Sequence, residues 1–196
     1  MRKLIRKLSD MRGISGFEYR LTDQIADMFK KYCDDVKIDS LGSVIAVKRS
    51  NKPNAPKLMI EAHCDEIGLI VTSITDEGYL TFANVGGVDE RTLPSTEVTV
   101  HGKEDLWGVI GIKPNYLLEQ GKTAKLKELA VDTGLSAEKV KKLAAVGDSI
   151  TLAQSVGRLG KKQFSGKSLD DRASVAAIMR VMKNIKDLDI DIDVYA

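Results

Sequence analysis

A histidine and three carboxylates fall within six consecutive residues of this chain, at positions 61–66. They come at the end of a mostly apolar run, residues 58–62, that predicts a central strand, and sites in open α/β sheets form where strands end. In an extended backbone His63 and Asp65 point to the same side. One of them could bind a metal ion while the other orients it, since a ligating histidine usually needs a carboxylate partner. The spacing alone leaves an incidental surface pair as the alternative.

A second acidic group lies about a hundred residues later, where residues 166–168 lead into Asp170 and Asp171 at the start of a predicted amphipathic helix. Aspartate at a helix N-terminus accepts backbone N–H bonds and complements the helix dipole, which is worth about 0.3–2 kcal/mol. Capping would therefore explain at least one of the two residues. A carboxylate in this position could equally bridge two divalent cations, one on each oxygen.

The elements that must position these groups are predicted from hydrophobic periodicity. Apolar residues at helical spacing predict helices over residues 4–11 and 17–32, the second with a capping box formed by Ser15 and Glu18. Alternation over residues 36–38 and 44–47, around a turn at Gly42, predicts a hairpin.

The pattern changes between residues 67 and 158, where short strand-like runs are separated by glycines. We expect a small inserted β-barrel or sandwich, interrupted by helical patterns near residues 125–129 and 137–145, with Trp107 in its core. After residue 166 the α/β pattern returns as a helix and then a strand over residues 190–196, from whose abrupt end we expect truncation. The predicted domains are a catalytic α/β domain formed by residues 1–66 and 159–196, and an inserted domain formed by residues 67–158.

Composition and charge match an ordinary soluble globular protein. A net charge of +2, with charged residues at 30%, shows no bias toward nucleic acid, and the basic stretch 122–142 is interspersed with acids as in a solvated face. No apolar run approaches the ~18 residues of a membrane helix, and no signal-peptide core follows the basic start. Cys33 and Cys64 form no disulfide framework. We therefore expect a cytoplasmic protein that binds neither nucleic acid nor membrane.

Several motifs in one order give a much more specific prediction than either acidic group alone. They occupy residues 13–16, 41–46, 63–68, 85–87, 108–111 and 166–172. In this order the chain resembles the glutamyl and deblocking aminopeptidase family, which includes the tetrahedral aminopeptidases and proteins also named endoglucanase M. The resemblance covers essentially the whole chain and corresponds to the N-terminal half of the family protein.

The resemblance implies a zinc-peptidase-like α/β domain, incomplete here, with a β-rich insertion that helps subunits pair into hollow homo-oligomers. It implies an aminopeptidase that acts on peptides with two divalent metal ions, zinc or cobalt. By motif position, His63 would bind one metal, Asp65 would orient His63 and tune the site, and Asp170 would bridge both metals. Asp171 and Arg172 then correspond to residues that start the helix or support the ligands.

The family site also needs a Glu-Glu pair, in which one glutamate is the general base and the other is a metal ligand. Further downstream it needs an Asp and a His as ligands. None of these four residues lies in this sequence. We therefore expect the chain alone to bind metal weakly and to hydrolyse little, since a catalytic zinc takes about three protein ligands. We predict that His101 is a solvated turn residue, and Cys64 a small buried hydrophobe without a base to activate it. Asn115 stands where the family commonly has a histidine.

Two other functions stay open at this point. The chain could be an assembly module without chemistry, which would self-associate with or without metal. Glycoside hydrolysis would instead need two carboxylates about 5–9.5 Å apart around a sugar site, and Asp65 and Asp170 could supply them only without a metal role.

Overall fold

The computed structural model describes residues 1–112 and 125–196, so Asn115 lies outside the described residues. The described elements form an α/β fold divided into two compact units. The first unit comprises Met1–Asp65 and Ser155–Ala196, and the second comprises Glu66–Gln154. Each unit has a separate hydrophobic core of its own residues.

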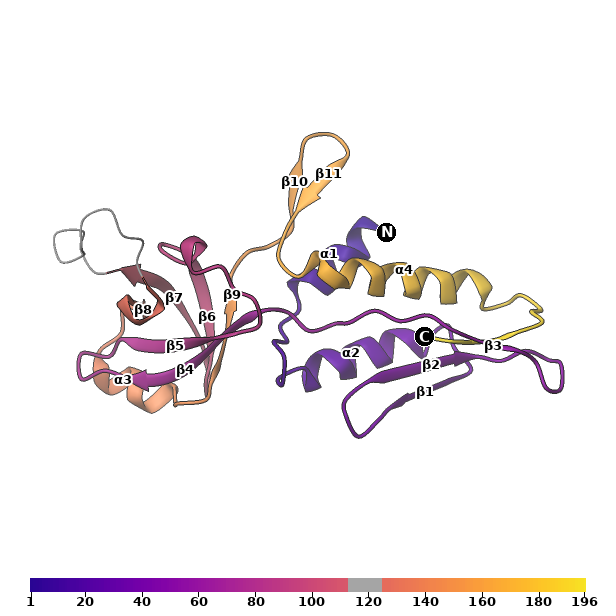
Figure 1. Cartoon of the computed structure of the whole chain (residues 1–196), viewed down its shortest axis with the longest axis horizontal. Helices are drawn as coiled ribbons and strands as arrows, with labels where there is room; N and C mark the ends of the chain where they lie inside the picture. The colour runs from indigo at the N-terminus through magenta and orange to yellow at the C-terminus, as the bar shows by residue number, and fades with distance from the viewer. Residues whose placement is uncertain (113–124) are drawn as a thin grey trace. The chain divides into compact units, whose positions relative to one another are not determined.

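The first unit contains three helices, a four-stranded sheet and a small hairpin among the described residues. Its elements are α1 (Arg2–Asp10), α2 (Tyr19–Phe29), β1 (Asp35–Ile38), β2 (Val44–Lys48), β3 (Lys57–Met59), β10 (Gly157–Leu159), β11 (Gln163–Ser165), α4 (Leu169–Ile185) and β12 (Asp193–Tyr195). The two predicted helices, the first hairpin and the C-terminal strand are therefore confirmed. Helices α1 and α4 run side by side, as Figure 1 shows.

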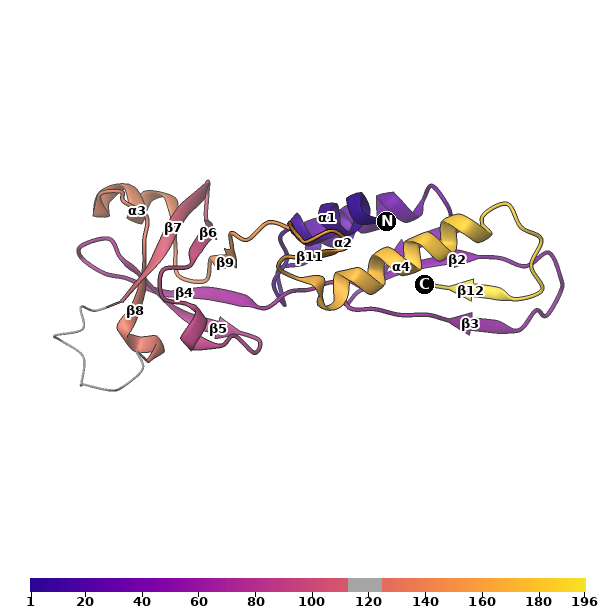
Figure 2. The same cartoon turned by 90° about the horizontal axis from the view of Figure 1, so that it is seen from above.

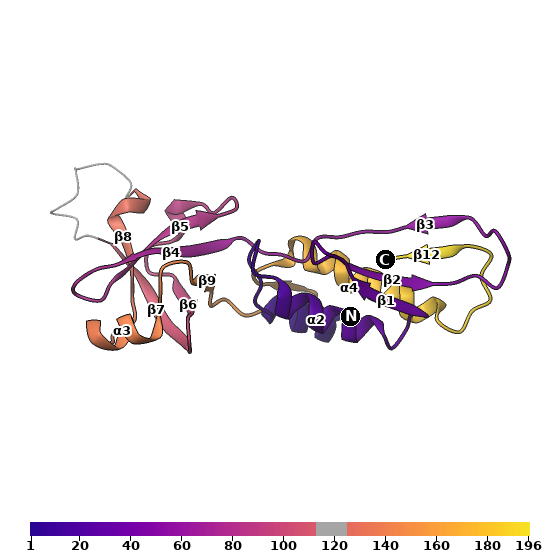
Figure 3. The ribbon, with the colours of Figure 1, turned by 90° about the horizontal axis from the view of Figure 1, so that it is seen from below.

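The sheet has the strand order β1-β2-β12-β3, with β12 antiparallel to β2 and parallel to β3. Figure 2 shows β12 between β2 and β3, and Figure 3 shows α2 beside β1 and β2, against which it packs. The prediction of a central strand at residues 58–62 was wrong in this sheet. Strand β3 lies at the edge, because β12 is the one described strand that pairs with it. Its side chains are not buried, with Leu58 46% and Met59 71% exposed.

The core of the first unit forms between the helices and the sheet. Burial of the apolar faces of α1, α2 and α4 supplies most of it, as their periodicity predicts, through Leu8, Leu21, Ile25, Met179 and Met182. The predicted capping box was wrong, since the N-cap of α2 is Glu18, whose carboxylate accepts the Gly16 N–H at 2.9 Å.

The second unit is a closed six-stranded barrel with the strand order β4-β5-β8-β7-β6-β9. Its elements are β4 (Gly68–Ile74), β5 (Leu80–Val85), η1 (Glu90–Thr92), β6 (Glu97–His101), β7 (Asp105–Ile112), η3 (Leu126–Glu128), β8 (Leu129–Asp132), α3 (Ala137–Leu143) and β9 (Ser149–Leu152). The predicted barrel and its two short helical segments are present. Strands β8 and β9 were missed, although β1, which is equally short, was predicted.

Two side chains of the barrel differ from their predictions. Trp107 is 57% exposed rather than buried, because residues alternate across β7 and its neighbours Leu106 and Gly108 point inward. His101 is not a solvated turn residue: it ends β6, and its side chain is 11% exposed. The ring nitrogens of His101 lie 2.9 Å from Asp105 Oδ1 and 2.8 Å from Thr151 Oγ1.

Within the two described stretches, no helix combines the length and the apolar character that crossing a membrane requires.

Candidate metal centre

His63 lies between two carboxylates, one close in sequence and one distant. Its Nδ1 is 2.9 Å from Asp65 Oδ1, and its Nε2 is 3.1 Å from Asp170 Oδ1, although 107 residues separate His63 from Asp170. The three residues singled out from the sequence are therefore brought together. A ring that donates its Nδ1–H to Asp65 presents Nε2 to Asp170.

The local backbone explains why Asp170 reaches the histidine instead of capping α4. Asp170 has φ −90° and ψ 106°, and Asp171 has φ −121° and ψ 31°, so regular helical geometry begins only after them. The side chain of Asp170 is 97% exposed and accepts from His63. Asp171, joined to Asp170 by a cis peptide bond, is half-buried at the same turn. The position of Asp170 thus departs from the simple capping interpretation.

Ser15 is a site residue that the sequence did not reveal. Its hydroxyl donates to Asp65 Oδ2 at 2.5 Å, on the oxygen that His63 does not use. The Ser-x-x-Glu spacing indicated a capping box, but the hydroxyl is used to fix a carboxylate fifty residues away. Both oxygens of Asp65 are therefore held, which fixes the orientation of the His63 ring.

The hydrogen bonds set the charge state of the pair. Partial burial alone would lower the pKa of His63, but its hydrogen bonds to Asp65 and Asp170 outweigh this and hold the pKa above its ordinary value. Burial would raise the pKa of Asp65, but the bonds from Ser15 and His63 hold it below its ordinary value. The same contacts therefore favour the carboxylate form of Asp65 and the protonated form of His63.

Arg172 connects the loop that carries Ser15 to the segment that carries His63. The side chain is fully buried, and its Nε donates to the Cys64 carbonyl at 2.8 Å. The rest of the guanidinium donates to carbonyls at the end of α1 and beyond, namely those of Leu8, Ser9, Met11 and Gly13. Arg172 therefore fixes the backbone on both sides of the site.

Two side chains of the first unit, those of His63 and Asp170, have the chemistry and the separation of neighbouring metal donors. With Zn–N and Zn–O distances of about 2.0–2.2 Å, two ligands of one tetrahedral zinc lie about 3.4 Å apart. The 3.1 Å between His63 Nε2 and Asp170 Oδ1 fits this edge within a small movement. In residues 1–112 and 125–196, no group of three or more ligand-type side chains surrounds such a point. The described site therefore fits a metal with part of its protein ligands.

The two cysteines are poor candidates for nucleophiles. Burial raises the pKa of the Cys33 thiol to about 11, and burial also raises that of Cys64. Cys64 packs at the edge of the core of the first unit and is half-buried, less than the full burial that was predicted. The chemistry of this site therefore lies with the imidazole and the carboxylates.

Comparison with known proteins identifies the family of a chain with this site. The family model for M42 glutamyl aminopeptidases matches residues 42–196, which is more than half of the chain. The chain belongs to the M42 glutamyl aminopeptidase family. A lysyl aminopeptidase of Pyrococcus furiosus is 33% identical over 99% of this chain and 58% of its own length.

Solved structures of similar proteins share the fold of this M42 chain. An aminopeptidase of the archaeon Desulfurococcus kamchatkensis aligns with a TM-score of 0.91 and 36% identity, over 98% of this chain and 54% of the other. The TET1 peptidase of Pyrococcus horikoshii aligns with a TM-score of 0.87 and 33% identity, over 99% of this chain and 59% of the other. The chain spans about half the length of these relatives and corresponds to their N-terminal part.

Proposed function

We propose that this chain supplies part of the catalytic centre of a metal-dependent aminopeptidase, with His63 and Asp170 as metal ligands. The observation that carries this proposal is the 3.1 Å approach of His63 Nε2 and Asp170 Oδ1 across two distant parts of the chain. Membership of the M42 family supports the peptidase activity and a requirement for divalent metal. The metal is zinc or cobalt, and peptides are the substrates.

The residues of the site have separate tasks in this proposal. Asp65, held by Ser15, accepts the Nδ1–H of His63 and leaves Nε2 as the atom that would bind a metal. Asp170 would be a ligand shared by the two metal ions. When bound, the metal pair would lower the pKa of a shared water and polarise the first peptide carbonyl. The free α-amino group of the substrate binds at the same site, so cleavage starts at the N-terminus.

The described donors are fewer than the three protein ligands that a catalytic zinc normally takes. We therefore propose weak metal binding and little hydrolysis for the 196-residue chain alone. Glycoside hydrolysis is not favoured, because Asp65 and Asp170 both engage the same imidazole and leave no sugar site between them.

Zinc titration of the chain tests the ligand assignment. We expect binding weakened at least about tenfold in His63→Ala and in Asp170→Asn, since each removes one of two donors. His101→Ala removes the only other histidine, which is in the barrel, and is the matched control that should bind zinc as the original chain does. Isothermal titration calorimetry gives both affinity and stoichiometry.

Two results would contradict this assignment. Unchanged zinc affinity in both site variants would remove His63 and Asp170 from the metal centre. The chain alone could instead release N-terminal residues from peptides rapidly, with the activity abolished by His63→Ala. That result would contradict the proposal that the site is incomplete, but it would support the proposed peptidase activity.

We also propose that copies of this chain associate through the barrel. The related TET1 peptidase can assemble into a tetrahedron or a large octahedral shell. In the barrel of this chain, Trp107 is 57% and Tyr79 44% exposed, and exposed aromatic side chains are typical of interfaces. Light scattering should give an oligomer that persists in chelator and is reduced in size by Trp107→Glu. A monomer at all concentrations would contradict the proposal.

A further inference from the structure

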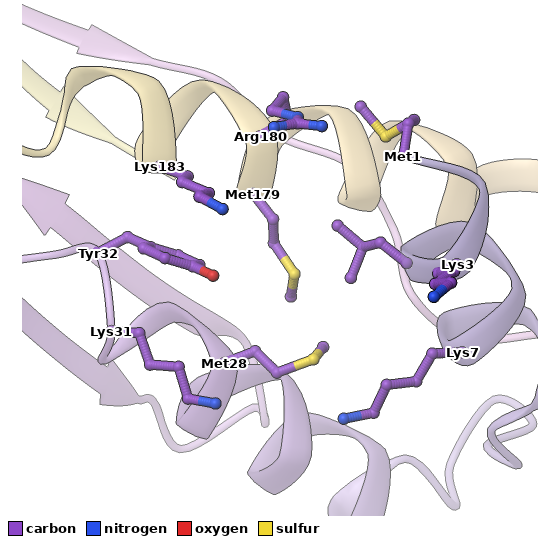
Figure 4. Close-up of a pocket in the computed structure, with 10 residues that line it drawn as sticks. Met1, Lys3, Lys7, Met28, Lys31, Tyr32, Met179, Arg180 and Lys183 are labelled. Atoms are coloured by element: carbon purple, nitrogen blue, oxygen red, sulfur yellow. The ribbon is translucent and has the colours of Figure 1, made fainter.

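A pocket of about 280 Å³ lies among α1, α2 and α4 of the first unit. Figure 4 shows side chains from all three helical regions converging on it. It is lined by Met1, Lys3, Leu4, Lys7, Met28, Lys31, Tyr32, Met179, Arg180 and Lys183. None of the residues assigned to the metal centre lines this pocket. On α4 the lining begins at Met179, seven residues beyond Arg172, which is about 10 Å of helix.

The rim of the pocket carries five positive charges and no carboxylate. Lys3, Lys7, Lys31, Arg180 and Lys183 all line it. None of these five takes part in an ion pair found between described residues. The nearby carboxylate of Asp27 accepts from Lys30 at 2.8 Å and does not line the pocket. The pKa of Asp27 is lowered by its bond from Lys30 and also by the charge of Lys31, so Asp27 partly offsets Lys31. The pocket is still positive, because its described lining residues carry five cations and no carboxylate.

The spacing of these charges is unfavourable for the helices themselves. Lys3 and Lys7 are four residues apart on α1, and Arg180 and Lys183 are three apart on α4, so each pair is adjacent on a helix surface. Like charges at such spacing destabilise a helix, and here both pairs face one pocket. A multivalent anion between them would remove the repulsion and gain charge-assisted hydrogen bonds.

The floor of the pocket is apolar and contains an aromatic ring. Met179 is 2% exposed, and Leu4 and Met28 are half-buried beside it. Lys183 Nζ lies 5.9 Å from the centre of the Tyr32 ring, at the boundary between floor and rim. Thioether sulfur and aromatic rings make favourable contacts, so this floor suits a flat, polarizable group. A free inorganic anion would leave the floor unused.

We propose that this pocket binds a nucleoside polyphosphate, with the base on the Met179–Tyr32 floor and the phosphates among the five cations. The volume is near the lower end of small-ligand sites, which favours a compact ligand over a peptide segment. A membrane surface fits less well, because the apolar atoms lie at the bottom of the pocket below a charged rim. This proposal does not depend on the aminopeptidase assignment.

Calorimetry with the 196-residue chain and three probes, ADP, pyrophosphate and adenosine, separates the contribution of the charged rim from that of the apolar floor. We expect ADP to bind at least about tenfold more tightly than pyrophosphate, and adenosine to bind more weakly than ADP, because only ADP uses both rim and floor. The affinity for ADP should fall as salt rises, since the cations are exposed and screened.

Paired charge reversals test the location. Lys7→Glu with Arg180→Glu should weaken ADP binding at least about tenfold, through lost attraction and added repulsion. Arg2→Glu with Lys186→Glu makes the same change of net charge on α1 and at the end of α4, outside the pocket, and should weaken binding less than about threefold. Tyr32→Ala should reduce the affinity for ADP toward that for pyrophosphate. Circular dichroism checks that each variant is folded.

Three results would overturn the proposal. Equal weakening by the two charge-reversal pairs would show attraction to net charge instead of a site. Equal affinities for ADP and pyrophosphate would show that the nucleoside part of the ligand contributes nothing to binding. No binding of ADP at low salt, or binding of an acidic peptide but not ADP, would exclude the ligand class.

Discussion

Replacing Arg172 by alanine is expected to destabilise the first unit by about 3–5 kcal/mol, because several buried carbonyls would lose their donor. The guanidinium is fully buried and donates to the carbonyls of Cys64, Leu8 and Gly13 among others. Arg172→Lys should recover only part of this loss, since an ammonium has three donors and cannot reproduce the planar fork.

Urea unfolding with hydrogen exchange, read peptide by peptide, measures this effect in the first unit separately. Arg180→Ala is the matched control, because Arg180 is exposed on the same helix and its loss should change stability by less than about 0.5 kcal/mol. If Arg172→Ala were as stable as the control, the carbonyls would have other partners and Arg172 would not organise the site.

Ile150→Ala is expected to destabilise the barrel by about 2–5 kcal/mol, through lost apolar contact and the cavity that remains. Ile150 is fully buried on β9, where it pairs with Leu69 of β4 on one side and Val100 of β6 on the other. It therefore joins strands from distant parts of the barrel sequence.

The same unfolding and exchange experiment, read on peptides from β4, β6 and β9, measures this change. Ile67→Ala removes the same atoms from a side chain that is 48% exposed, and should cost less than about 1 kcal/mol. Equal losses in the two variants would mean that the closed barrel does not bury Ile150 as described.

The periodic elements of this chain could be predicted locally because their burial is one-sided. The apolar faces of α1, α2 and α4 recur at helical spacing, and the alternation of β1 and β2 indicates a hairpin directly. Strands β8 and β9 were missed although β1 is equally short, and β8 begins at Leu129, where the pattern of residues 125–129 had indicated a helix. The outward direction of Trp107 depends on the register of β7 in the closed barrel, which hydrophobicity alone does not give.

In the candidate site, too, some residues could be predicted from the sequence and others could not. The residue types singled out His63, Asp65 and Asp170 as candidates, and the order of the motifs, which resembles that of the family, implied their roles at a metal. Ser15 was assigned to a helix cap, since a Ser-x-x-Glu spacing looks the same whether the hydroxyl bonds its own backbone or a distant carboxylate.

The sequence by itself determined the helices, the β-rich insertion and the chemistry available at residues 63, 65 and 170. Only the tertiary structure decided that His63 contacts Asp170, that Arg172 joins α1 to the Cys64 carbonyl, and that five cations surround one apolar pocket. Local pattern records which face of an element is apolar. Contacts between residues a hundred positions apart depend on how those faces pack, which no local spacing contains.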